Sequence, residues 1–139
     1  MYCQFEVAGE PRGKARPRAG KYRMYNPVSN AEYEAKVRAA YLAKAGLLDP
    51  VDGPVRMLIR MFHSVPKSTS KRKKADMLGG KIRPLIKSDV DNCAKIIMDA
   101  LNKVAYLDDK QVVDLRIVKH YSENPRVYVL VEELTHETT

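Results

Sequence analysis

Two β-rich runs near the C-terminus restrict what this chain can fold into. Residues 111–121 and 126–133 are rich in Val, Ile, Leu and Tyr, and the four residues Ser122-Glu123-Asn124-Pro125 separate them. A short polar turn of this kind favours two antiparallel strands in a hairpin. The alternation of apolar and polar residues over 54–62 predicts a further strand. The chain is therefore expected to build a β-sheet.

Helical patterns fall between these β-rich runs. Residues 26–45 show helical spacing, residues 70–78 predict a short basic helix, and residues 91–104 carry an apolar stripe. With a first strand over residues 2–8, the predicted order is β-α-β-α-α-β-β. This order predicts an α+β fold, with a mixed β-sheet, helices packed on one face and a C-terminal antiparallel hairpin.

The size of the chain predicts a single domain over residues 1–139. Residues 9–26 read as a basic loop and residues 135–139 as a mobile tail. No apolar run approaches the roughly 18 residues of a membrane span, and the N-terminus lacks the layout of a secretory signal. We therefore expect a cytoplasmic protein with no membrane partner.

The charge of the chain is divided between two regions. Residues 1–88 carry 19 Lys and Arg against 7 Asp and Glu, whereas residues 89–139 carry 6 against 10. The balances are +12 and −4, which sum to the net charge of +8. Carboxylates repel phosphate unless cations lie between them, so an acidic cluster in a basic protein suggests bound metal beside a polyanion.

The acids gather around the predicted helix 91–104. Asp89 and Asp91 project to the same side if the chain is extended there, and Lys95 lies one helical turn beyond Asp91. Asp108 and Asp109 follow the end of the helix. Mg²⁺ prefers oxygen ligands and commonly takes one or two carboxylates. Asp89, Asp91, Asp109 and Lys95 are therefore candidates for a metal-dependent nuclease site.

A structural interpretation of the same acids stays open. Ser88 and Asp91 fit a helix N-cap, and Asp91 with Lys95 fits an ordinary ion pair worth about 0.3–0.5 kcal/mol. Asp99 and Asp114 are expected to be structural, because Asp99 lies well along the helix and Asp114 follows an apolar pair.

Basic residues form two clusters suited to nucleic acid. One is interleaved with tyrosines that could stack on bases, and the other follows the predicted strand over 54–62. Solvated surface is the alternative for either cluster alone, and two clusters in one small chain favour contact with DNA. The candidates are Arg12, Lys14, Arg16, Arg18, Lys21, Arg23, Lys71, Arg72, Lys73, Lys74 and Lys87.

Together these motifs resemble the RusA family of Holliday junction resolvases, which is common in bacteria and their prophages. The resemblance rests on Lys87-Ser88-Asp89-Val90-Asp91-Asn92 with Lys95, on Asp99-Ala100-Leu101-Asn102, and on Asp108-Asp109 with Gln111-Val112-Val113-Asp114. Gly13 to Arg18 and Pro125 to Val129 also look like phage-borne members. Ser88 departs from relatives that carry a basic residue directly before the first aspartate.

The resemblance implies an activity and a set of roles. A homodimer would cut four-way DNA junctions by paired symmetric nicks in recombination and repair, using Mg²⁺ with Mn²⁺ as a plausible substitute. The metal-binding acids would be Asp89, Asp91 and Asp109, the catalytic lysine Lys95, and Asp108 a lesser metal candidate. Two rival readings are a DNA-binding accessory protein without catalysis and a nuclease of broader specificity for flaps and forks.

Overall fold

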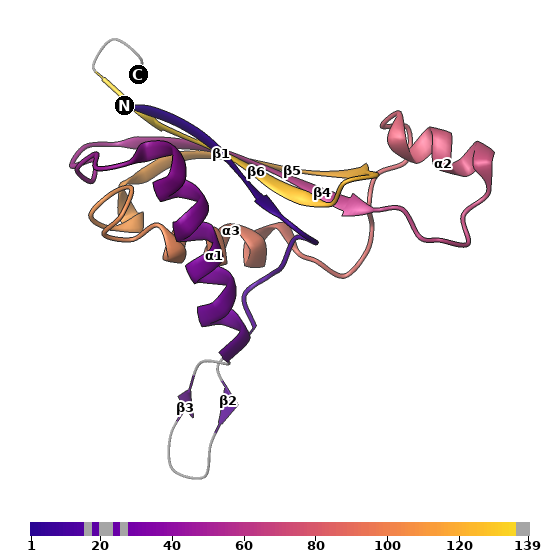
Figure 1. The fold of residues 1–139 in the computed structure, drawn as a ribbon, viewed down its shortest axis with the longest axis horizontal. Coiled ribbons are helices and arrows are strands. Elements are labelled where there is room, and N and C mark those ends of the chain that lie inside the picture. Colours follow the sequence, from indigo (N-terminus) through magenta and orange to yellow (C-terminus); the bar gives the residue numbers. More distant parts are fainter. Residues whose placement is uncertain (16–17, 20–23, 26–27, 136–139) are drawn as a thin grey trace.

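The computed structural model describes residues 1–15, 18–19, 24–25 and 28–135 (Figure 1). Its helices and strands follow the predicted order, with two short additional strands inside the predicted loop 9–26. The elements are β1 Tyr2–Ala8, β2 Arg18–Ala19, β3 Met24–Tyr25, α1 Val28–Ala45, β4 Val55–Ser64, α2 Lys71–Leu78, α3 Val90–Ala100, a 3₁₀ turn Asp109–Gln111, β5 Val112–Ser122 and β6 Arg126–Glu133.

Four strands form a mixed sheet in the order β1-β6-β4-β5. β6 runs antiparallel to both β1 and β4, whereas β5 runs parallel to β4. Parallel neighbours need a long crossover, and residues 65–111 supply it with α2 and α3. The predicted α+β fold with a mixed sheet is confirmed, and the crossover carries every candidate acid of the site.

The two C-terminal strands are joined by the predicted turn but do not pair directly with each other. β4 lies between β5 and β6 and pairs with both, while the other edge of β6 pairs with β1. Alternate residues of β4 face the core, where Val55, Met57, Ile59 and Met61 are all at most 1% exposed.

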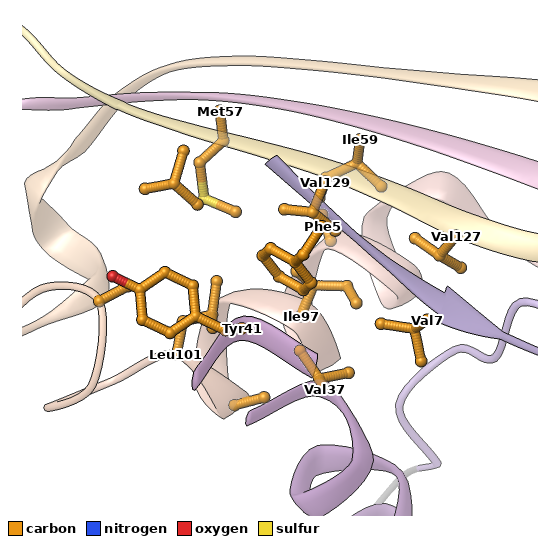
Figure 2. Packing of buried hydrophobic residues seen from close by; sticks show 14 of the residues in the cluster. Phe5, Val7, Val37, Tyr41, Met57, Ile59, Ile97, Leu101, Val127 and Val129 are labelled. Atoms are coloured by element: carbon orange, nitrogen blue, oxygen red, sulfur yellow. The ribbon is translucent and has the colours of Figure 1, made fainter. Parts of the chain in front are cut away.

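The core lies between the sheet and the two longer helices. Figure 1 shows α1 and α3 on the same side of the sheet, and Figure 2 shows Val37 and Tyr41 of α1 facing Phe5 and Val129 of the sheet. Phe5 and Tyr41 meet edge to face with ring centroids 5.7 Å apart. This packing confirms the prediction that helices cover one face.

The third helix ends four residues earlier than its pattern predicts. Leu101 caps it, and Lys103 adopts a left-handed backbone with φ of 66°. The apolar stripe nevertheless continues into the following turn, where Leu101 and Tyr106 are completely buried. The hydroxyl of Tyr106 donates to the carbonyl of Met98 at 2.7 Å, which folds the chain back along α3. The residues after Tyr106 therefore lie beside the helix.

The predicted basic helix is α2, and it projects away from the helical layer (Figure 1). Ser70 caps it by accepting a hydrogen bond from the backbone of Lys73 at 3.3 Å. Lys74 forms an ion pair with Glu123 at 3.4 Å in the turn before β6. Across the described ranges, no helix is long and apolar enough to cross a membrane.

Candidate functional site

Asp89 and Asp91 lie at the N-terminus of α3, and both are exposed. Asp89 is the N-cap by backbone geometry but makes no capping bond with its side chain. Ser88 does not form the alternative cap, because its hydroxyl is buried without a partner. Neither carboxylate is paired with another side chain in the described part of the chain. Both are therefore free to accept a ligand.

Asp99 lies two turns further along the same face of α3 and is surrounded by lysines. Its carboxylate accepts a hydrogen bond from Lys14 of the N-terminal loop, and Lys95 approaches it at 3.9 Å. Lys14 also pairs with Glu34 of α1 at 3.5 Å. The side chains of Lys14, Asp99 and Glu34 are only 18–20% exposed, so this network is largely buried.

The charges of this network shift the pKa of Lys14. Burial would lower that pKa, but the hydrogen bond and charge of Asp99, with the charge of Glu34, raise it above the usual value. Lys14 therefore stays protonated. It is placed as an internal partner of two carboxylates, whereas the sequence predicts a DNA contact for it.

Asp109 lies close enough to Asp99 for each carboxyl group to influence the charge of the other. Burial, the charge of Asp108 and the contact with Asp99 raise the pKa of Asp109, while the charge of Lys95 opposes them. Lys95 thus lies close to both Asp99 and Asp109, and the predicted ion pair between Lys95 and Asp91 is replaced by one with Asp99.

A side-chain amide fixes the position of Asp109. Gln111 donates from its Nε2 to the carbonyl oxygens of Val51 at 2.7 Å and Gly53 at 2.9 Å. Its Oε1 accepts from the backbone of Asp108 at 2.8 Å, completing a capping box. The carboxylate of Asp108 accepts from the backbone of Lys110 at 3.0 Å. Asp108 is therefore used in building the turn that presents Asp109.

The N-terminal loop packs directly on α3. The backbone of Lys14 donates to the carbonyl of Asn92 at 3.1 Å. A side chain at Gly13 would place its Cβ 2.9 Å from the Cβ of Asn92, so only glycine fits this approach. The backbone of Ala15 exchanges two hydrogen bonds of 2.9 Å with the side chain of Asn30. The loop is thereby anchored on both sides of Lys14.

Two hollows meet at Asp89. One is lined by Arg12, Lys14 and Lys87 together with Asp89. The other is lined by Asp89 and Asp91 with an apolar group that includes Leu85. Of the other predicted DNA contacts, Lys71, Arg72, Lys73 and Lys74 lie on α2 and are exposed, Arg18 lies in β2, and Arg16, Lys21 and Arg23 lie outside the described residues.

The candidate acids form two pairs rather than one group. Within residues 1–15 and 28–135, no three His, Cys, Asp or Glu side chains gather closely enough to hold a metal ion together. Exposed carboxylate oxygens nevertheless fit a hard divalent cation, which commonly takes one or two carboxylates and completes its shell with water and phosphate. Asp89 and Asp91 offer that donor chemistry, and Asp99 and Asp109 form the second pair.

The sequence interpretation expected Asp99 to be structural, and the structure places it in ion pairs with Lys14 and Lys95. Its spacing of four residues from Lys95 and eight from Asp91 places all three on one helical face. That periodicity was the available signal, whereas the contact with Lys14, 85 residues away, depends on the tertiary fold.

Comparison with known proteins identifies the family of this chain. Residues 8–132 match the sequence model of the family described as endodeoxyribonuclease RusA. An uncharacterized protein, YqaN of Bacillus subtilis (strain 168), is 40% identical over 145 residues, covering 97% of this chain and 99% of that protein. The matched range includes all the acids at both ends of α3. The chain belongs to the RusA family of endodeoxyribonucleases.

Proposed function

We propose that this endodeoxyribonuclease resolves four-way DNA junctions by paired nicks, with Asp89, Asp91 and Asp109 binding Mg²⁺ and Lys95 assisting catalysis. Family membership supports action on branched DNA and dependence on a divalent metal. The choice of Mg²⁺, the paired nicks and a role in recombination and repair are part of the proposal. Mn²⁺ is expected to replace Mg²⁺, since both accept carboxylate oxygens.

One observation carries most of the proposal. Asp89 and Asp91 are exposed and unpaired in the described chain, yet Asp89 borders a hollow that also contains Arg12, Lys14 and Lys87. A DNA phosphate attracted by Arg12 and Lys87 would be repelled by bare carboxylates. A divalent cation between acid and phosphate removes that conflict, which supports a metal-dependent phosphodiesterase.

The metal ion and three side chains would then have separate roles in cleavage. A bound divalent ion lowers the pKa of water and neutralises charge that develops on the phosphate. Lys95, whose side chain is 62% exposed, can reach the same charge from the face of α3 between the two acidic pairs. Lys14 neutralises Asp99. Asp109 would therefore be the acid of the second pair that remains available to the metal.

The two nicks suggest a homodimer. Cutting strands symmetrically requires two active sites related by a twofold axis, and a C2 dimer provides them from one chain. Sedimentation of the protein with and without a four-way junction tests this part of the proposal, with two chains expected per junction.

The activity is tested with synthetic four-way junctions, replication forks and linear duplexes in Mg²⁺. The wild-type protein should nick junctions fastest, and Asp91→Asn should bind junctions normally while losing cleavage. Asp114→Asn is the matched control, since Asp114 is an exposed acid paired with Arg56 at 3.0 Å on β5. Its cleavage rate should equal that of the wild type.

Three results would contradict the proposal. A shifted band without product in the wild type indicates a binding protein. Equal rates on forks and junctions indicate a broader nuclease. Full activity of Asp91→Asn shows that Asp91 is not a metal ligand needed for cleavage.

A further inference from the structure

The loop between α2 and α3 is hydrogen-bonded to β5. Arg83 donates from Nη1 to the carbonyl of Lys119 at 2.9 Å and lies 3.3 Å from Nδ1 of His120. Lys119 in turn donates from Nζ to the carbonyl of Ile86 at 3.0 Å. Pro84 is buried between these contacts. Hydrogen bonds to β5 therefore tie the loop on both sides of Leu85.

An apolar side chain stands at that tip. Leu85 is 96% exposed, whereas its neighbours Ile86 and Val90 are 44% and 38% exposed. These three residues line the same hollow as Asp89 and Asp91. Leu85 is therefore an exposed apolar side chain directly beside the proposed metal-binding acids. A partner that binds there can bury its apolar surface.

The charges around Leu85 favour DNA as that partner. Lys81, Arg83 and Lys87 lie within the same short segment, and Lys119 borders the hollow. Basic side chains hold phosphates, and the apolar surfaces that DNA offers are the faces of its bases. A single projecting leucine fits insertion between two bases better than it fits a flat protein interface. Leucine is among the side chains that partly unstack base steps in this manner.

We propose that Leu85 is a wedge that enters the branch point of the junction, unstacks the base step there and fixes which phosphodiester reaches Asp89 and Asp91. The inference rests on the proposed junction cleavage and deepens it. A branch point suits such a wedge, because unstacking costs least where base pairing and stacking are already interrupted.

The test uses four-way junctions that carry 2-aminopurine at the branch point, with Ca²⁺ replacing Mg²⁺. Wild-type protein should raise the fluorescence, and Leu85→Ser should lose about half or more of that gain while junction affinity changes less than about twofold. In Mg²⁺, Leu85→Ser should nick about tenfold more slowly and at more than one position. Leu85→Met, which keeps an apolar wedge, should restore both signals.

Leu47→Ser is the matched control. Leu47 is a completely exposed leucine just after α1, and it lines neither hollow at Asp89. It should leave fluorescence and nicking unchanged. The inference is overturned if Leu85→Ser behaves like Leu47→Ser, or if Leu85→Ser changes the sedimentation of the protein alone, which would place Leu85 against a second copy. A fluorescence gain without nicking by the wild type would contradict the proposed function and leave the wedge standing.

Discussion

The two acidic pairs along α3 differ in their surroundings. Asp89 and Asp91 at the N-terminal end are exposed and have no side-chain partners among the residues described. Asp99 and Asp109 near the other end are half-buried and lie close together, with Lys14 and Lys95 near Asp99. The first pair is therefore exposed and, within the described ranges, unpaired, whereas in the second pair Asp99 is neutralised by lysines and Asp109 remains available.

The largest effect is expected at the exposed pair. Asp89→Asn should slow nicking on the order of 1,000-fold, about 4 kcal/mol of transition-state stabilisation, because a charged ligand of the proposed metal is lost. The free energy of unfolding should change by less than about 0.5 kcal/mol, since the side chain has no partner to lose. Single-turnover cleavage and urea unfolding measure the two quantities. If Asp89→Asn were stable and fully active, the exposed pair would have no special role in catalysis.

Lys95 should behave as part of the exposed, catalytic surface although it touches Asp99. Lys95→Met is expected to lower the nicking rate about 100-fold, as for loss of one charge-stabilising donor. Its 3.9 Å contact with Asp99 is solvent-exposed on the lysine side, so stability should change by at most about 0.5 kcal/mol. Cleavage rates and urea midpoints are compared with those of Lys103→Met, a lysine in the turn after α3.

Replacing Lys14 should affect the stability of the protein more than its nicking rate. Lys14→Met removes the largely buried partner of Asp99 and Glu34, so unfolding free energy should fall by about 2 kcal/mol. The urea midpoint should then fall by about 1 M. Lys14→Arg, which keeps the charge, should recover part of the loss. A variant with normal stability but a weaker dependence of junction affinity on salt would instead make Lys14 a phosphate contact.

The smallest effect is a pH dependence confined to the buried pair. The pKa of Asp109 is raised in the folded protein, so its contribution to stability is complete below the unfolded value near 3.8 and is lost as pH rises through the folded value. Asp109→Asn carries no charge at any pH. It should therefore raise the melting temperature at pH 7 in EDTA and leave it unchanged near pH 3.

The strand and helix patterns of the sequence predicted the elements well because each depends on nearby residues. Strand order depends on long-range pairing, and no periodicity indicated that β4 lies between β5 and β6. The same limit applies to the site. The motif at Asp89 and Asp91 is local, whereas burial of Lys14 against Asp99 requires the N-terminal loop to pack on α3 across 85 positions. Glycine at position 13 permits that packing only once the helix is present.

The side-chain amide of Gln111 makes the position of Asp109 depend on long-range folding of the chain. Its bonds to Val51 and Gly53 span 60 and 58 positions, so Asp109 is held only after β5 has docked beside β4. Contacts between such distant positions form late, because loop closure must precede them. Asp109 therefore reaches its place beside Asp99 only in the fully folded molecule, whereas Asp89 and Asp91 are neighbours in any chain that has formed α3.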